Sequence, residues 1–323
     1  MDERTEFLRS PADISGHPAL KAWSQLQAEP VETGEISVLK QRLKSTIYRI
    51  KILEPRPFSI VAKYCQRRVA AHERFIYDQI LPKVPVSSPY YHGFVKGRDD
   101  YDWLFLEYVE GERYSWRCEG HAALAGRWLG LLHAFTNRIA AEARLPELGS
   151  AYYLALLRGA REKLRRNLEL LDLPPEDLAV IQAVISQCDF LESHWNQVEG
   201  WCESMPRTLL HGDFKPKNII VRASCEGPVL VPFDWEASGW GVPAEDIAYV
   251  NLAAYHAVVK GHWPDLSMQD LEYMKTVGTI LRGLSEIFWE SVKFEPHWEV
   301  SSAKLCFYQT RMAEAIEMAK WGE

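Results

Sequence analysis

The sequence lacks the features that mark secreted, membrane-spanning and zinc-binding proteins. Its six cysteines lie far apart and form no C-x-x-C pair, so neither a disulfide framework nor a zinc site is expected. No run of 18 apolar residues occurs, and the N-terminal stretch MDERTEFLRSPADISG has no apolar segment of the signal-peptide kind. There is no internal repeat or low-complexity segment. We therefore expect a reduced, cytoplasmic, globular protein with no membrane contact.

The sequence also lacks an excess of positive charge. It has 37 Lys and Arg against 44 Asp and Glu, a net charge of −7. A nucleic-acid-binding protein needs a basic stripe to displace counterions, so no nucleic-acid partner is expected. The segment through Glu110 carries a net charge of +1 and the remainder −8. The acidic remainder is either an ordinary solvated surface or a region that attracts a cationic substrate.

The apolar residues, 47% of the chain, are sufficient for a sizeable core. Residues 1–30 read as a polar lead-in with a short helix. Apolar positions at helical spacing, closed by Pro82, predict a helix over residues 67–81. Runs rich in β-branched and aromatic residues predict five strands, at 35–40, 46–53, 58–65, 90–95 and 103–109. The first half of the chain is thus predicted to contain three strands, one helix and two strands.

The chain changes character after Gly111. Apolar residues keep helical spacing over three long segments, 124–139, 157–171 and 178–195. A β-rich interval over residues 208–236 interrupts the helices, which resume near residue 243. The sequence therefore predicts an α+β protein with a small β-rich N-terminal lobe over residues 31–110, a hinge near 107–111, and a larger, mostly helical C-terminal lobe over 111–323.

Two polar runs carry the residues suited to chemistry. HGDFKPKN (211–218) and DWE (234–236) each follow an apolar, strand-like segment. A turn that leaves a strand presents its polar side chains at the edge of a lobe, so Asp213, Asn218 and Asp234 can meet across a hairpin. A few oxygen ligands, completed by water and phosphates, are what Mg²⁺ prefers. Taken singly, Asp213 and Asn218 are also ordinary turn formers.

These runs resemble the signature of the aminoglycoside phosphotransferase/choline kinase family, small-molecule kinases related to the protein kinases. The resemblance extends to SIVAKYC with Glu73 ten residues after Lys63, to WLFLEYVEG, to HAALAGRWLGLLHA, and to GVPAEDIA (241–248). Together the matches cover roughly residues 35–250. The resemblance implies a bilobal protein-kinase-like fold in which the C-terminal lobe holds the catalytic loop 211–218, the metal loop 234–236 and the substrate-binding helices.

The resemblance also implies a role for each matching residue of the two runs. Asp213 would orient or accept the proton of the attacking hydroxyl, and Asn218 and Asp234 would hold Mg²⁺ on the nucleotide phosphates. Lys215 either steadies the transferred phosphoryl group or is a solvated loop lysine. Asp246 would brace the catalytic loop.

Four further residues are implied to bind the nucleotide, which is expected to be ATP, with GTP left open. Lys63 would contact the α- and β-phosphates and be held by Glu73. The backbone of Glu107 and Val109 would bond the adenine edge.

The stretch expected to cover the phosphates departs from the family pattern. Residues 41–46 contain no glycine, although glycines let backbone N–H groups approach phosphates closely. Ser45 and Thr46, or Lys44, are the residues expected to substitute.

The leading interpretation is an ATP-dependent phosphotransferase that acts on a hydroxyl of a small molecule. A catalytically inactive kinase-like binding module is the main alternative, supported by the glycine-free loop. A protein kinase is less consistent, because D-W-E replaces D-F-G and GWGVPAED leaves no room for a long activation loop.

The acceptor is left open among aminoglycoside antibiotics, choline-like amines, sugars and natural-product alcohols, and so is the oligomeric state. From residue 241 onward the net charge is −5, which together with several tryptophans favours a cationic acceptor. Asp270, Glu286 and Glu290 are candidate partners for its amine.

Overall fold

The computed structural model describes residues 7–8, 11–29, 32–54, 57–137, 145–171, 173–293 and 298–321. Contacts divide the chain into two compact units. Unit 1 comprises Met1–Ser115 and Asp213–Ala237, and unit 2 comprises Trp116–Gly212 and Ser238–Glu323. The run that holds both polar motifs is thus divided between the units after Gly212.

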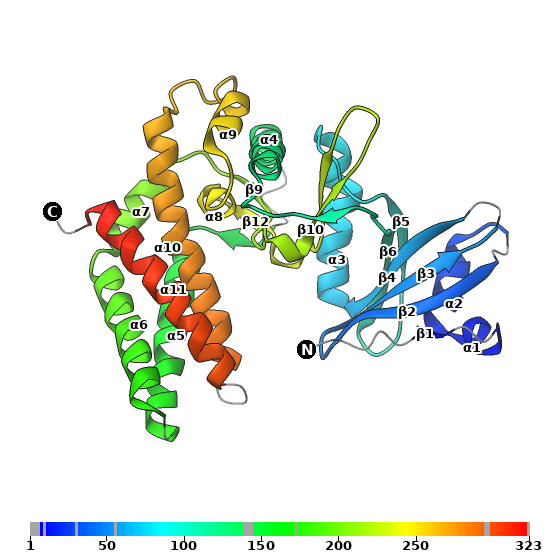
Figure 1. Ribbon diagram of the computed structural model, residues 1–323, viewed down its shortest axis with the longest axis horizontal. Helices are drawn as coiled ribbons and strands as arrows, with labels where there is room; N and C mark the ends of the chain where they lie inside the picture. The colour runs from blue at the N-terminus through cyan, green and yellow to red at the C-terminus, as the bar shows by residue number, and fades with distance from the viewer. Residues whose placement is uncertain are drawn as a thin grey trace. The chain divides into compact units, whose positions relative to one another are not determined.

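Unit 1 contains a six-stranded antiparallel sheet with the strand order β1-β2-β3-β4-β6-β5 (Figure 1). The five strands predicted in this part of the sequence are present, and β5 and β6 pair antiparallel. The bounds are β1 Phe7–Leu8, β2 Thr33–Arg42, β3 Ser45–Ile52, β4 Phe58–Gln66, β5 Tyr91–Val95 and β6 Tyr101–Glu107.

The predicted helix over 67–81 is present but changes its hydrogen-bond pattern along its length. It begins as α3 (Arg67–Phe75), continues as a π-helical turn (Ile76–Ile80), and ends in a 3₁₀ turn (Leu81–Lys83). Pro82 explains the ending, because it has no N–H to donate and its ring clashes with the carbonyl four residues earlier. The buried side of α3 carries Glu73 towards the sheet.

Part of the lead-in belongs to the core of unit 1. The helices α1 (Pro11–Gly16) and α2 (Pro18–Trp23) pack on the sheet, and Trp23 is only 1% exposed. Its ring contacts Phe105 and His92 at centroid distances of 5.4 and 5.3 Å. The lead-in was expected to be polar; the apolar positions of α2 instead lie on one helical face and cover the sheet.

A second, three-stranded sheet completes unit 1, with the order β11-β10-β7. Its strands are β7 Glu112–Arg113, β10 Ile219–Arg222 and β11 Val229–Pro232. This pairing explains why contacts assign Asp213–Ala237 to unit 1, whereas the sequence assigns the same residues to the helical lobe. The chain after Gly111 approaches β10 closely, since a Cβ at Gly111 would lie 2.4 Å from the Val221 carbonyl oxygen.

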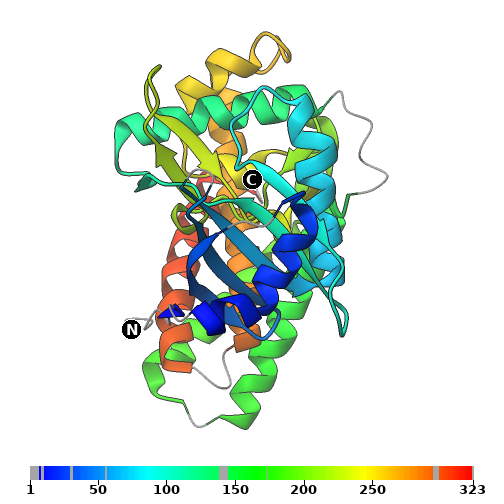
Figure 2. The ribbon, with the colours of Figure 1, turned by 90° about the vertical axis from the view of Figure 1, so that its right-hand side faces the viewer.

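Unit 2 is mainly helical (Figures 1 and 2). Its helices are α4 Glu119–Thr136, α5 Ser150–Leu170, α6 Pro175–Ser193, α7 Trp195–Ser204, α8 Ala244–Ile247, α9 Leu252–Val259, α10 Met268–Lys293 and α11 Trp298–Ala319. A short sheet, β8 (Glu147–Leu148), β12 (Gly239–Gly241) and β9 (Thr208–Leu210), joins them in the order β8-β12-β9. Among the described residues, no helix combines the length and apolar character needed to cross a membrane.

The helix predicted over 178–195 is two helices, because α6 ends at Ser193 and α7 begins at Trp195. The Ser193 hydroxyl donates to the Phe190 carbonyl, and the His194 ring also contacts that oxygen. Side chains that compete for a backbone carbonyl in this way weaken the helix at that point. Residue 139, the end of the first predicted helix, lies outside the described residues.

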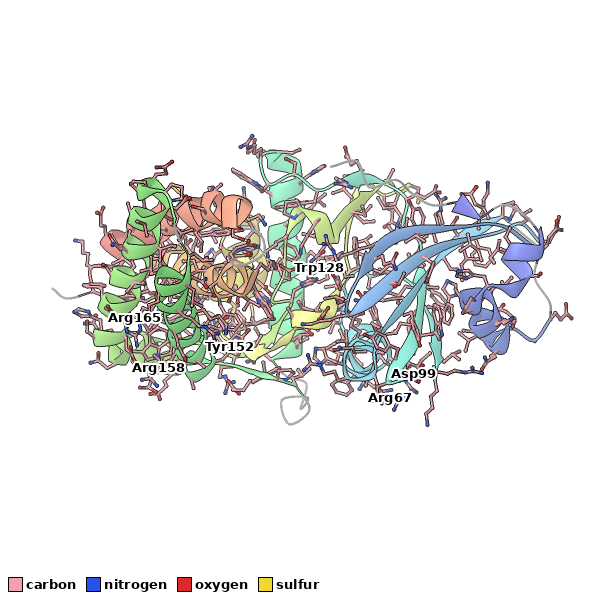
Figure 3. All side chains as sticks on the ribbon, turned by 90° about the horizontal axis from the view of Figure 1, so that it is seen from below. Arg67, Asp99, Trp128, Tyr152, Arg158 and Arg165 are labelled. Atoms are coloured by element: carbon pink, nitrogen blue, oxygen red, sulfur yellow. The ribbon has the colours of Figure 1, made fainter. Side chains whose placement is uncertain are left out.

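The helices α5 and α6 are joined by ion pairs on their outer surface. Arg158 and Arg165 of α5 (Figure 3) pair with Glu192 and Asp189 of α6 at 2.6 and 3.2 Å. Exposed pairs of this kind add little to stability but favour one register of the two helices.

Candidate active site

A buried lysine joins two carboxylates in unit 1. Lys63 lies in β4, and its ammonium group is 2.6 Å from Glu73 Oε1 and 2.7 Å from Asp234 Oδ1. The Lys63 side chain is 6% exposed. One partner comes from α3, ten residues after Lys63, and the other follows β11, so the tertiary structure brings Asp234 to a pair from which it is distant in the sequence.

The three charges set one another's protonation states. Burial alone would lower the pKa of Lys63, but Glu73 and Asp234 outweigh it and hold the pKa well above its usual value. Burial alone would raise the pKa of Asp234, but Lys63 outweighs it and lowers the pKa to about 2. Burial raises the pKa of Glu73 to about 7, against the attraction of Lys63. Near neutral pH, Lys63 is therefore a cation and Asp234 an anion.

The backbone of Asp234 adopts an unusual conformation. Its φ is 69°, in the left-handed region that residues other than glycine rarely occupy. Asp and Asn tolerate this region better than most residues, and such outliers cluster at functional sites. The next residue begins a short 3₁₀ turn, Trp235–Ala237.

The carboxylate of Asp213 is surrounded by donors from its own loop. Lys215 Nζ lies 2.5 Å from Oδ1, Lys217 Nζ 2.9 Å from Oδ2, and Asn218 Nδ2 donates to Oδ2 at 2.8 Å. Burial would raise the pKa of Asp213, but Lys215 and Lys217 outweigh it and lower the pKa. The group is therefore ionised at neutral pH and its orientation is fixed.

The pairing of β10 with β11 connects Asn218 to the second motif. Ile219 faces Pro232, and the Phe233 N–H donates to the Asn218 carbonyl at 2.9 Å, one residue before Asp234. The Asn218 amide nitrogen donates to Asp213, which leaves its amide oxygen for a cation.

The donors of this site suit magnesium better than a transition metal. No group of three or more His, Cys, Asp or Glu that could hold a metal occurs in the described part of the chain. One carboxylate and one amide oxygen, completed by phosphates and water, fit Mg²⁺.

The two residues expected at the adenine edge lie at the end of β6. Glu107 is its last residue, and Val109 follows two residues later, outside the sheet. The Glu107 N–H donates to the Tyr90 carbonyl at 2.8 Å, and its side chain forms an ion pair with Arg222. The Tyr108 N–H donates to the Ser59 carbonyl of β4 at 3.1 Å, so the Glu107 carbonyl of the same peptide points away from β4.

The structure places Ser45 and Thr46 within β3. They pair with Arg42 and Gln41 on one side and with residues 65 and 64 on the other. The turn itself consists of Leu43 and Lys44, and Leu43 is 99% exposed.

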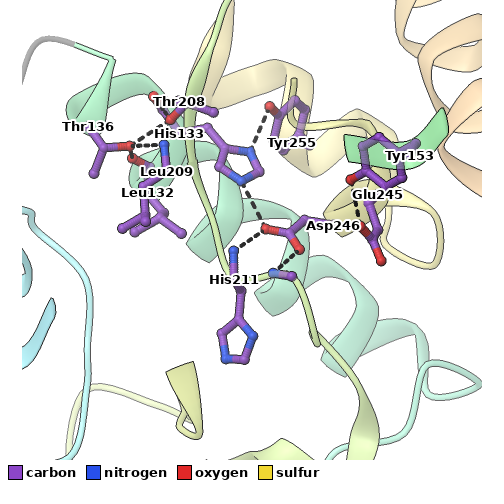
Figure 4. Close-up of polar contacts among 11 residues, drawn as sticks. Leu132, His133, Thr136, Tyr153, Thr208, Leu209, His211, Glu245, Asp246 and Tyr255 are labelled. Carbon is purple, nitrogen blue, oxygen red and sulfur yellow. Dashed lines mark hydrogen bonds and ion pairs between the residues drawn. The ribbon is translucent and has the colours of Figure 1, made fainter. Parts of the chain in front are cut away.

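In unit 2, Asp246 holds the backbone that precedes Asp213 (Figure 4). The carboxylate is 1% exposed and accepts from the His211 N–H at 2.6 Å and the Gly212 N–H at 3.1 Å. The ring of His133, from α4, lies 3.4 Å from the same carboxylate. Burial would raise the pKa of Asp246, but its contact with His133 outweighs burial and lowers it.

The candidate amine-binding carboxylates have other partners in the structure. Asp270 accepts from the Ser267 N–H and hydroxyl at the start of α10. Glu290 pairs with Lys304 of α11 at 3.2 Å. Glu286 is buried on the same helix and raises the pKa of the nearby Tyr308 hydroxyl, after burial itself. The contacts of Asp270 thus lie at the start of α10 itself, and those of Glu290 join α10 to α11.

Three polar residues at or beside the site were missed in the sequence. Lys217 lies inside the motif, four residues after Asp213, and the motif spacing could have revealed it. His133 lies in the segment HAALAGRWLGLLHA, but its burial beside Asp246 has no sequence signal. Lys40 of β2 lies close enough to Asp234 to contribute to its low pKa, after burial and Lys63.

A family model described as the phosphotransferase enzyme family (APH) matches residues 65–262 of the sequence. Comparison with curated protein sequences found no match.

Several solved structures resemble the chain. A mutant of aminoglycoside 2′-phosphotransferase IIIa in its GDP complex matches with a TM-score of 0.62 and 15% identity, over 92% of this chain and 97% of that one. Choline kinase from Cryptosporidium parvum matches with a TM-score of 0.60 and 12% identity, over 96% of this chain and 94% of that one. Spectinomycin phosphotransferase in complex with ADP and spectinomycin matches with a TM-score of 0.55 and 10% identity, over 90% of this chain and 93% of that one. At these identities the similarity shows the fold alone, and it confirms the kinase-like fold with a β-sheet N-terminal region and a helical C-terminal region.

Proposed function

This chain belongs to the phosphotransferase enzyme family, and on that premise we propose that it transfers the γ-phosphoryl group of a nucleoside triphosphate to a hydroxyl of a small molecule. The observation that carries the proposal is the buried Lys63, whose ammonium group bridges Glu73 and Asp234. A buried cation held between two carboxylates from different elements is expensive to maintain for stability alone. It suits a site that must receive a highly charged phosphate chain.

Lys63 provides the charge that phosphates need. In phosphoryl transfer, catalysis is mostly positioning and electrostatic stabilisation, and a lysine held by a helix glutamate serves both. Glu73 fixes the ammonium group from one side, so that its remaining hydrogen can point at the nucleotide. Asp234 and Asn218 would hold Mg²⁺, which neutralises phosphate charge when bound. The backbone of Glu107 and Val109 would meet the adenine edge.

Asp213 and Lys215 act on the acceptor side. The ionised carboxylate of Asp213 accepts a hydrogen bond from the acceptor hydroxyl and orients its oxygen towards the γ-phosphorus. Its lowered pKa makes it a weak base, so it takes the proton late, after the new P–O bond has begun to form. Lys215 is 2.5 Å from Asp213, within reach of the transferred phosphoryl group.

We propose an amine-bearing alcohol as the acceptor, and ATP as the donor with GTP as the alternative. Aminoglycosides and choline, the compounds in the names of two similar proteins, are both amine-bearing alcohols. The net charge of −5 from residue 241 onward supports a cationic acceptor. Because Asp270 and Glu290 have other partners, long-range attraction is the support for this acceptor, and not a defined pair.

An inactive nucleotide-binding module is the second candidate, and the tight turn at Leu43 and Lys44 favours it. This turn has no glycine to let backbone N–H groups reach phosphates. The ion pairs of Lys63 and the donors around Asp213 favour the enzyme, since a module without turnover does not need an oriented Asp213.

The two candidates are separated by measuring consumption of ATP and of GTP, with Mg²⁺, against a panel of neutral, anionic and amine-bearing alcohols. An enzyme of the proposed class phosphorylates a member of the panel, and its acceptor KM rises with ionic strength if attraction is electrostatic. Nucleotide binding without turnover on any alcohol would favour the inactive module. Turnover restricted to neutral or anionic alcohols would contradict the proposal of a cationic acceptor but would still support phosphotransferase activity.

A further inference from the structure

The turn that should cover the phosphates is too short and too stiff for that purpose. Arg42 pairs with Ser45, so only Leu43 and Lys44 connect β2 and β3. Neither residue is glycine, and both adjacent strands are paired up to the turn. If this lobe binds a nucleoside triphosphate, as the proposed function requires, the phosphates need donors other than a glycine-rich backbone.

A β-bulge in β2 changes which side chain faces the site. Val38 pairs with Tyr48, but Lys40 and not Leu39 pairs with Ile47, so Leu39 is an extra residue in the ladder. In a regular strand Lys40 would share the face of Val38, two residues before it. The bulge moves it to the opposite face, and bulges next to active sites commonly redirect a side chain in this way.

Lys40 therefore lies in the same cross-strand row as Lys63. Lys40 faces Ile47 of β3, and Ile47 in turn faces Lys63 of β4. Directly paired residues point to the same side of a sheet. With strands about 4.8 Å apart, the Cα atoms of the two lysines are separated by about 10 Å, a gap that a polyphosphate chain can span between two ammonium groups.

The other face of the sheet has a different use. Val38, Tyr48 and Phe105 lie on the face covered by α2 and Trp23, in the core of unit 1. Glu73 and Asp234 bond Lys63 on the side that Lys40 joins. On this face Lys40 lies on the same side of the sheet as the carboxylates that bond Lys63.

We propose that Lys40, redirected by the bulge at Leu39, is a second phosphate-binding cation of the nucleotide site and replaces the missing glycine-rich loop. The inference rests on the proposed function, because it assigns Lys40 to the same nucleotide. Glu73 and Asp234 offset the positive charge of Lys63 in the free protein, so this face tolerates a second lysine before an anion binds.

The experiment compares three variants by calorimetric titration with AMP, ADP and a non-hydrolysable ATP analogue, each with Mg²⁺. Lys40→Met removes the charge and keeps the length of the side chain. The exchange Leu39→Lys with Lys40→Leu keeps the net charge but moves the lysine out of the row. Lys51→Met, at an exposed lysine of the adjacent strand β3, is the matched control for loss of charge.

Lys40→Met and the exchange variant should each weaken binding of the ATP analogue about tenfold, the usual contribution of one charge-assisted hydrogen bond, with a smaller effect on ADP and none on AMP. Lys51→Met should bind all three like the wild type. The thermal midpoint of free Lys40→Met should stay close to that of the wild type, because Lys40 is partly exposed and an exposed charge contributes little to stability.

Wild-type affinity for the ATP analogue in both Lys40 variants would overturn the inference and leave the proposed function intact. Wild-type affinity in the exchange variant alone would overturn the role of the bulge. An equal loss for AMP and the ATP analogue would also overturn the assignment, since it would not involve the phosphates. A wild-type protein that binds none of the three nucleotides would instead contradict the proposed function itself.

Discussion

Replacing Asp246 with asparagine should destabilise the protein and slow turnover without weakening nucleotide binding. The two oxygens of the Asp246 carboxylate have different partners: Oδ2 accepts from the His211 N–H and Oδ1 from the Gly212 N–H. An amide has one acceptor oxygen, so Asp246→Asn can satisfy only one of these donors. The other N–H faces an NH₂ group and loses its partner.

The magnitude follows from these two bonds. An unpaired buried donor costs about 1–3 kcal/mol, and the remaining bond weakens from a charge-assisted to a neutral one, about another 1 kcal/mol. Gly212 is only half-buried, so its N–H is the cheaper one to leave to water. We therefore expect a loss of about 2–3 kcal/mol in the free energy of unfolding.

Urea unfolding followed by circular dichroism measures this loss as a lower midpoint with an unchanged slope. Turnover should fall because Asp213 follows Gly212 directly, while the affinity for an ATP analogue should stay constant because Lys63 and Asp234 do not bond Asp246. Asp270→Asn is the matched control: it makes the same chemical change at an exposed helix start, where a cap is worth about 1 kcal/mol. If Asp246→Asn lowers the free energy of unfolding no more than Asp270→Asn does, the hydrogen bonds from His211 and Gly212 to Asp246 do not hold the loop in place.

Three further predictions concern the remaining charged groups. Asp213→Asn should lower turnover at least about tenfold, the usual minimum for a proton-accepting group, with unchanged nucleotide affinity by titration; a smaller loss contradicts its role. Lys63→Ala should weaken nucleotide binding and also lower kcat, and Glu73→Gln should do both more mildly; wild-type affinity and kcat in Lys63→Ala would contradict the assignment of Lys63 to the phosphates. Burial raises the pKa of Glu245 to about 7, against the opposing effects of Tyr153 and Arg282. The contribution of Glu245 to stability is therefore fully present below its unfolded pKa and is lost as the pH rises through about 7. Glu245→Gln should therefore gain stability over the wild type between about pH 5 and 8, by up to about 3 kcal/mol in urea unfolding; a difference that does not change with pH would contradict the shifted pKa.

The sequence was sufficient for the order of the long elements between β2 and β6. Alternating β-branched and aromatic residues locate strands because a strand with one buried face repeats every two residues. The motif HGDFKPKN follows a predicted strand and the lysine of SIVAKYC lies within one, so the sequence places these candidate site residues on particular elements. The boundaries of the helix ending at Pro82 followed equally well, because proline acts locally.

The sequence could not show which partners these residues meet. Lys63 and Asp234 are 171 positions apart and lie 2.7 Å from each other in the structure. His133 and Asp246 likewise come from separate helices. Local periodicity carries no information on such pairs, since they depend on how finished elements pack.

The same limit applies to the side of a sheet on which a residue lies. Regular alternation puts Lys40 on the face of Val38, and one extra residue at Leu39 reverses this. The left-handed φ of Asp234 is similarly absent from its residue type, because Asp adopts such a conformation only when its neighbours hold it there. The sequence by itself determined most of the long strands and helices and the candidate site residues. The tertiary structure alone decided which of them face one another, because register, bulges and packing are settled by contacts between segments distant in the chain.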